Sequence, residues 1–81
     1  MIIKTEIYTP KGMELETEAV AIIVPTRSGE ISVLPRHVPI ISVLKPGKMI
    51  IKTAQKDIER KIEGGILEVT EDKVTLLLKK F

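Results

Sequence analysis

The stretch SGEISVLPRHVPIISVLKPG, from Ser28 to Gly47, contains three of the five prolines and the only histidine of the chain. Pro35 and Pro39 restrict their own φ angles and leave two backbone nitrogens without a proton on either side of His37. Such a segment cannot sit in the middle of a sheet, where each backbone nitrogen is needed for pairing. The sequence therefore predicts a rigid corner between two strands, with His37 as a structural or partner-contact residue.

The rest of the chain has a period of two rather than 3.6. Apolar and glutamate side chains alternate from Met13 to Ala19, and a similar alternation runs from Ile58 to Glu63, as in half-buried strands. Two short apolar runs, Ala19–Val24 and Val74–Leu78, are typical of strands covered on both faces. Turn signals recur at short spacing, at positions 9–12, 25–29, 35–37, 46–47, 64–65 and 71–73. We therefore predict a single all-β domain over residues 1–81, a two-sheet β-sandwich of about ten short strands, with a small barrel as the related architecture.

The composition agrees with a small, densely packed soluble domain. Isoleucine, valine and leucine supply 27 of the 81 residues, and 30% of the residues are charged. A chain of this length buries only about 60% of its unfolded surface, so it needs such a high share of large aliphatic side chains. The chain has no cysteine, which excludes disulfides and thiolate metal sites.

No group of residues predicts an enzyme. His37 has no second histidine for a metal site, and no serine lies in a nucleophile elbow. Three glutamates, Glu14, Glu16 and Glu18, share one face of a strand, but a solvated face explains them without a metal. The pair Gly64-Gly65 lacks the lysine and the helix of a phosphate-binding loop, and we interpret it as two glycines that permit positive φ or a close sheet contact. We expect no catalytic residue, no metal and no cofactor.

A nucleic-acid-binding module is the alternative function. Six basic residues lie between positions 45 and 61, although the net charge of the chain is only +2. Basic residues on one stretch of chain can follow a phosphate backbone. Single-strand binding surfaces also stack bases on aromatic rings, and the chain has only Tyr8 and Phe81. We therefore rank a small basic β-barrel that binds nucleic acid second.

Three motifs in order carry a family resemblance. Gly29–Ile41 contains Leu-Pro-Arg-His-Val-Pro, Leu44–Gly47 reads Leu-Lys-Pro-Gly, and Gly64–Val69 reads Gly-Gly-Ile-Leu-Glu-Val. Together with Thr9-Pro10 and Val74–Leu77, they resemble the epsilon-subunit family of F-type ATP synthases over essentially the whole chain.

The resemblance implies a fold and a role. It implies the N-terminal sandwich of that family, with two five-stranded sheets, at the foot of the central stalk. There it implies a non-catalytic rotor subunit that binds the gamma subunit on one side and the membrane c-ring below, during proton- or sodium-coupled ATP synthesis. The expected location is the cytoplasmic face of the bacterial inner membrane, with the membrane reached only through the complex.

The resemblance also suggests contact residues. Glu30 falls where the bottom loop of the family meets the c-ring, and we add Arg27 and Arg36 because their charges flank that loop. Four positions resemble the gamma-facing edge of the family: Thr9, His37, Ile41 and Ser42. We further expect an exposed apolar surface for gamma around Ile40 and Ile41.

This sequence departs from the family pattern at four points. Ser32, Arg36 and Glu63 replace residues that are usually small or, at position 36, glycine or asparagine, so the local turns can differ. The fourth departure is the end at Phe81, where the family usually continues into a two-helix hairpin that inhibits ATP hydrolysis and in some members binds ATP. A naturally short chain and a truncated one are both compatible with this ending.

Overall fold

A computed structural model describes residues 1–81 and contains seven strands and no helix. The strands are β1 (Ile3–Thr9), β2 (Gly12–Ala19), β3 (Ala21–Thr26), β4 (Gly29–Val33), β5 (Ile40–Lys52), β6 (Asp57–Val69) and β7 (Lys73–Leu78). The all-β class and the sandwich are confirmed. The predicted number of about ten strands is wrong, because two of the seven are twice as long as expected.

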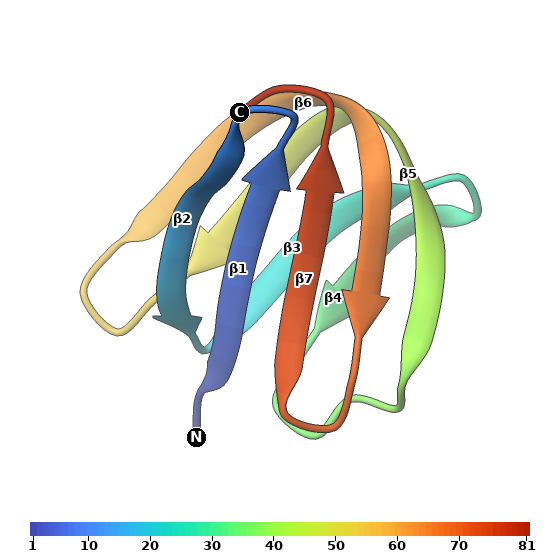
Figure 1. The fold of residues 1–81 in the computed structure, drawn as a ribbon. Helices are drawn as coiled ribbons and strands as arrows, with labels where there is room; N and C mark the ends of the chain where they lie inside the picture. The colour runs from blue at the N-terminus through green and yellow to red at the C-terminus, as the bar shows by residue number, and fades with distance from the viewer.

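All seven strands belong to one continuous sheet in the order β2-β1-β7-β6-β5-β3-β4. Only β1 and β7 run parallel, and every other neighbouring pair is antiparallel. The sheet folds over itself into two layers (Figure 1). The first layer holds β2, β1, β7, the second half of β6 and the first half of β5. The second layer holds the remaining halves of β5 and β6 with β3 and β4.

The length of β5 and β6 forces this bend. Each strand has 13 residues, which span roughly 43 Å when straight at about 3.3 Å per residue. The whole molecule is only 29 Å long, so both strands must curve from one layer into the other. We predicted turns at Pro46-Gly47 and at Gly64-Gly65, and both of these predictions are wrong. These pairs lie inside the long strands, at the bend. The interpretation of Gly64-Gly65 as glycines that permit positive φ or a close sheet contact is confirmed.

The buried face of both strands changes at the bend. In β5 the side chain of Leu44 is buried, Lys45 and Pro46 are both exposed, and Met49 and Ile51 are buried beyond them. The buried positions therefore change from even to odd numbers. In β6 they change in the same way between Gly64 and Leu67, with Leu44 paired to Gly65 and Pro46 to Glu63. The two layers enclose one core cluster of 15 buried apolar residues.

Gly65 is required at this bend. Its φ of +153° is a value that residues with a side chain rarely adopt. A Cβ atom built there lies 2.3 Å from the carbonyl oxygen of Leu77 and 3.0 Å from a side-chain carbon of Leu78. Strand β7 thus approaches the backbone of β6 where a side chain cannot fit. By contrast, a Cβ atom on Gly12, whose φ is +114°, meets nothing within 4 Å.

We predict that Gly65→Ala lowers the free energy of unfolding by about 3 kcal/mol, because overpacking and unfavourable φ each cost on the order of 1–3 kcal/mol. Gly12→Ala is the matched control, and its positive φ alone should cost about 1 kcal/mol. Urea denaturation followed by circular dichroism measures both. If both variants lose the same free energy of unfolding, the close approach of β7 adds nothing to the cost of a side chain at position 65.

Candidate functional site

An exposed row of apolar side chains crosses all five strands of the first layer. Its members are paired across neighbouring strands and therefore share one face: Met13 with Tyr8, Tyr8 with Leu77, Leu77 with Ile66, and Ile66 with Val43. Tyr8 is half-buried, and the other four side chains are 43–49% exposed. We call these five residues the apolar row. Small soluble domains rarely leave such a continuous apolar surface uncovered unless it binds something.

The next row on the same face is mainly acidic. Cross-strand pairing joins Glu16 to Glu6, Glu6 to Thr75, Thr75 to Glu68, and Glu68 to Ile41. We call these five residues the acidic row. Ile41 ends it at 74% exposure, and Ile40 beside it is half-buried. Of the predicted apolar surface around Ile40 and Ile41, only Ile41 faces outward, where it continues the apolar row. Ile40 lies on the opposite side of β5 and packs against the core.

Glu6 is the most enclosed charged group on this face. One carboxylate oxygen lies 3.5 Å from Nζ of Lys73, and the other lies 3.8 Å from Nζ of Lys4. The hydroxyl of Tyr8 donates a hydrogen bond to Glu6 Oε1 at 2.9 Å. This bond lowers the pKa of Glu6 below its ordinary value of 4.5, helped by the two lysines and opposed by burial. The same bond raises the pKa of Tyr8.

The Tyr8 hydroxyl thus joins the two rows. Its ring belongs to the apolar row, whereas its hydroxyl group is bonded to the acidic row. A tyrosine held in this way exposes part of its apolar ring while its hydroxyl group has a hydrogen-bond partner. This face therefore combines an exposed apolar row with a row of carboxylates that is held in place by a hydrogen bond and two lysines.

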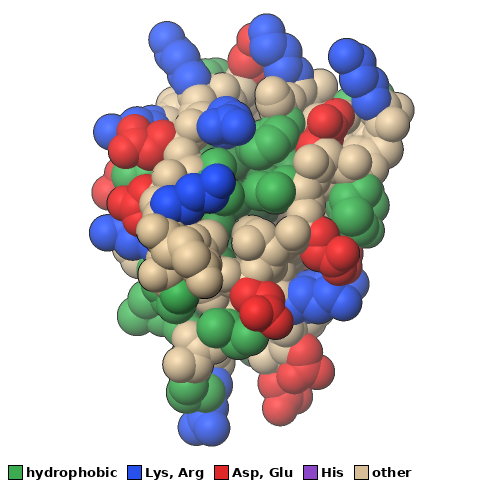
Figure 2. All heavy atoms as spheres, turned by 90° about the vertical axis from the view of Figure 1, so that its left-hand side faces the viewer, with side chains coloured by type: hydrophobic (Ala, Val, Ile, Leu, Met, Phe, Trp, Pro, Cys, Tyr) green, Lys and Arg blue, Asp and Glu red, His purple; other side chains and the backbone are tan.

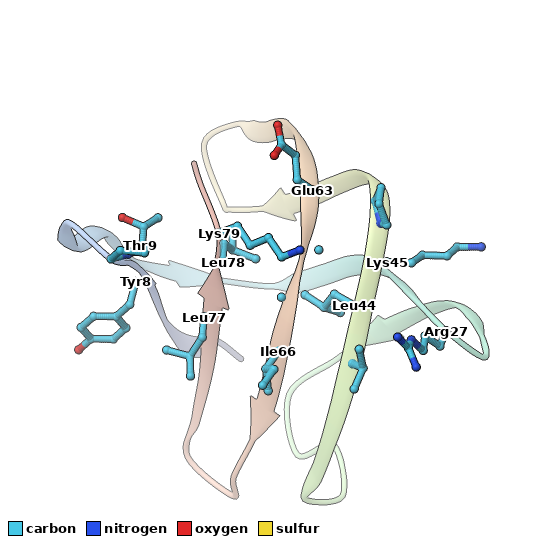
Figure 3. A pocket seen from close by; sticks show the side chains of 15 residues that line it. Tyr8, Thr9, Arg27, Leu44, Lys45, Glu63, Ile66, Leu77, Leu78 and Lys79 are labelled. Carbon is cyan, nitrogen blue, oxygen red and sulfur yellow. The ribbon is translucent and has the colours of Figure 1, made fainter.

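A shallow groove of about 660 Å³ lies where the apolar row meets the bend (Figure 3). Its floor includes Val43, Leu44 and Ile66, and its rim carries Lys45 and Lys79. Figure 3 shows the Lys79 side chain lying across the groove and Lys45 extending from β5. Arg27, from the β3–β4 turn, lines the same end as Lys45.

The structure separates the residues predicted to contact the c-ring. Arg27 lies in the β3–β4 turn and Glu30 in the first part of β4, so these two are close together. Arg36 does not flank this loop as we expected. It lies in the connection after β4, with a φ of 67°, and the five residues of β4 separate it from the turn. That length is roughly 16 Å in an extended strand.

The four residues predicted to contact gamma do not form one compact site either. Ile41 points outward from β5, whereas its neighbour Ser42 is half-buried on the opposite side of the strand. Thr9 ends β1. The ring of His37, in the β4–β5 connection, has Nδ1 2.7 Å from the carbonyl oxygen of its neighbour Val38. Only Ile41 belongs to either of the two rows.

Sequence reasoning missed most of the apolar row. We predicted that Val74–Leu78 is covered on both faces, and this is wrong. In β7, Val74, Leu76 and Leu78 are buried whereas Leu77 is 47% exposed. A run of three leucines conceals the alternation that reveals an outward position. Pairing this run with β1, whose side chains alternate, reveals that Leu77 faces outward. That parallel pairing is a long-range contact, and the sequence alone does not give its register.

The remaining surface does not favour nucleic acid. Basic and acidic side chains are interspersed around the apolar centre of the side that Figure 2 shows. Within the basic stretch, Lys48 lies 3.9 Å from a carboxylate oxygen of Glu59. The guanidinium group of Arg60 lies over the ring of Phe81, 5.0 Å from the ring centre, and occupies one face of that ring. No three acidic or histidine side chains are grouped as a metal would require, and the structure contains no helix that could cross a membrane.

The Glu6 site makes stability depend on pH. The pKa of Glu6 is lower in the folded state than its ordinary 4.5, so its contribution is complete above about pH 4.5 and disappears as the pH falls through the folded value. We predict that Glu6→Gln flattens the decline of the urea midpoint between pH 6 and pH 2.5. Glu18→Gln on β2, whose carboxylate forms no ion pair, should leave that decline unchanged. A decline as steep in Glu6→Gln as in the unmodified chain contradicts this interpretation.

Three comparisons place the chain among known proteins. The family model described as ATP synthase, Delta/Epsilon chain, beta-sandwich domain matches residues 2–81. The ATP synthase epsilon chain of Neisseria gonorrhoeae is 38% identical over 78 residues, which cover 94% of this chain and 56% of that protein. The plastid epsilon chain of Prototheca wickerhamii is 36% identical and is covered to 58%. The chain thus spans about half the length of the curated relatives it matches.

Solved structures agree on the fold. A chain in the mitochondrial ATP synthase of Euglena gracilis, solved with its c-ring, superposes with a TM-score of 0.91 at 23% identity. The match covers 98% of this chain and 51% of that one. A chain in the central stalk and c-ring structure of Tetrahymena thermophila gives a TM-score of 0.80 at 17% identity, covering 94% and 62%. With the family model matching nearly every residue, the resemblance is confirmed: this chain belongs to the ATP synthase delta/epsilon family, and its residues 2–81 match the β-sandwich domain of that family.

Proposed function

We propose that the chain is a non-catalytic part of the rotor of an F-type ATP synthase, where it links the gamma subunit to the membrane c-ring. The observation that carries the proposal is the uncovered apolar row on a family β-sandwich. Membership in the family supports the rotor assignment, because the relatives are ATP synthase epsilon chains. The similar folds occur in structures described by their central stalk or c-ring.

The first layer is the surface that we assign to gamma. A stable protein interface buries about 800 Å² on each partner, with an apolar centre and a polar rim. The apolar row supplies such a centre, and the acidic row with Lys4 and Lys73 supplies part of a rim. Ile41 is the strongest of the four proposed contacts because it lies on this face. We propose that the other three residues contact gamma at the edges of this face: Thr9, His37 and Ser42.

We assign the c-ring contact to the β3–β4 turn. Glu30 and Arg27 lie at one end of β4 and present opposite charges there. Arg36 lies at the other end of β4, so it can join the same contact only if the ring surface extends that far. The chain has no membrane-spanning helix, and we propose that it reaches the membrane through this contact. The expected place is the cytoplasmic face of a bacterial inner membrane.

The gamma contact is tested with the cognate gamma subunit by gel filtration and titration calorimetry. We expect the unmodified chain to form a one-to-one complex, and Ile66→Glu/Leu77→Glu to weaken it at least a hundredfold, because two charges replace the centre of the interface. Val20→Glu is the control, since Val20 is 36% exposed but lies outside both rows. Separate elution of unmodified chain and gamma would overturn the proposal.

The c-ring contact is tested by disulfide crosslinking in assembled ATP synthase. A Glu30→Cys variant should crosslink to cysteines placed in the polar loops of the c-ring. Glu59→Cys, in the first half of β6, should not. Crosslinking from position 59 but not from position 30 would mean that another edge of the sandwich faces the ring.

A further inference from the structure

The groove is lined by four of the five residues of the apolar row, and it also carries positive charge that the chain itself does not neutralise. Neither Lys45 nor Lys79 takes part in an ion pair. Arg27, which we assign to the c-ring contact, lines one end of the groove and is also without an ion pair. The one acidic residue that lines the groove is Glu63, and Nζ of Lys80 lies 3.4 Å from its carboxylate. The groove therefore combines an apolar floor with uncompensated cations, unlike the acidic row a few residues away.

We infer that this groove binds an acidic amphipathic helix of the gamma subunit. The inference rests on the proposed function and adds the chemistry of the segment that docks. Amphipathic helices bind apolar grooves through residues spaced by three and four positions, and charges at the rim select the partner. Two lysines beside the floor, Lys45 and Lys79, would meet carboxylates that flank the apolar stripe of such a helix.

The dimensions of the sheet agree with a short helix. The groove extends from β1 across β7 and β6 to β5, which is three strand spacings of about 4.8 Å, or roughly 14 Å. A helix rises about 1.5 Å per residue, so nine or ten residues cover that width. Two to three turns suffice to place three apolar side chains on the floor.

An anionic membrane surface is the less suitable occupant. The acidic row adjoins the apolar row on the same face, and Glu16 and Glu68 are exposed there. A flat anionic surface that reached the lysines would also meet these carboxylates and be repelled. A single helix, about 10–12 Å wide, meets fewer of these carboxylates than a flat surface does.

The binding test compares two double variants of the chain with the cognate gamma subunit. Lys45→Glu/Lys79→Glu should weaken the affinity by about tenfold to a hundredfold, because each reversal replaces an attraction by a repulsion. It should also reduce the loss of affinity between 50 and 500 mM salt. Lys52→Glu/Lys56→Glu, which reverses two exposed lysines at the opposite hairpin, is the control and should stay within about twofold. Thermal unfolding verifies that both variants fold.

Zero-length carbodiimide crosslinking then identifies the segment. Lys45 and Lys79 should both crosslink to glutamates or aspartates of gamma that lie within ten residues of each other. If gamma binds the unmodified chain and the two double variants bind equally well, the groove inference is wrong and the gamma assignment stands. If gamma does not bind the unmodified chain, the groove inference and the gamma assignment are both wrong. Cosedimentation with phosphatidylserine vesicles that only Lys45→Glu/Lys79→Glu abolishes would assign the groove to lipid and overturn the inference.

Discussion

Two strands that are longer than the molecule must bend, and the two-layered fold follows from that bend. The 13-residue strands β5 and β6 leave one layer and enter the other at the level of Lys45 and Gly64. The bend shifts the buried side of each strand by one position, which keeps apolar side chains inside both layers. It also brings β7 so close to Gly65 that only a hydrogen atom fits there. Any side chain at position 65 would push β7 away from β6. The first layer depends on the pairing of these two strands.

The binding face depends on the same bend. The second half of β6 and the first half of β5 complete the first layer, so Ile66 and Val43 come into line with Leu77 and Tyr8. The bonded pair of Tyr8 and Glu6 then holds the apolar ring beside a carboxylate, between Lys4 and Lys73. Little entropy remains to be lost when a partner binds such a preformed surface.

Local pattern predicted the fold class but not the strand connections. Alternation along Met13–Ala19 and the proline corner around His37 are local signals, and both correspond to observed elements. Pro46-Gly47 and Gly64-Gly65 have the composition of turns, yet they serve a bend inside long strands. What distinguishes a bend from a turn is the pairing of β5 with β6 over twelve rungs, and that is a long-range property. The outward position of Leu77 was hidden for the same reason.

The site residues show a similar division. The motif around Glu30 predicted a charged turn, and the structure places Arg27 beside it. Arg36 follows Arg27 by only nine positions in the sequence, but strand β4 lies between them and places Arg36 at the other end of the layer. Sequence distance along an extended strand is therefore a poor guide to a shared surface, whereas cross-strand pairing joins residues up to 69 positions apart, as for Tyr8 and Leu77.

A flat face on a stiff body suits mechanical coupling better than a cleft does. Torque passes between two bodies only if their contact resists sliding, and a wide interface with an apolar centre and matched charges resists it in several directions. The closely packed core transmits strain because it cannot deform without opening voids. The two proposed contacts adjoin each other: the gamma face lies on the first layer, and Arg27 of the turn before β4 lines one end of its groove. The backbone N–H of Arg27 donates a hydrogen bond to the carbonyl oxygen of Val43 in β5 at 3.1 Å, so a load applied at the turn reaches the face through a direct backbone contact.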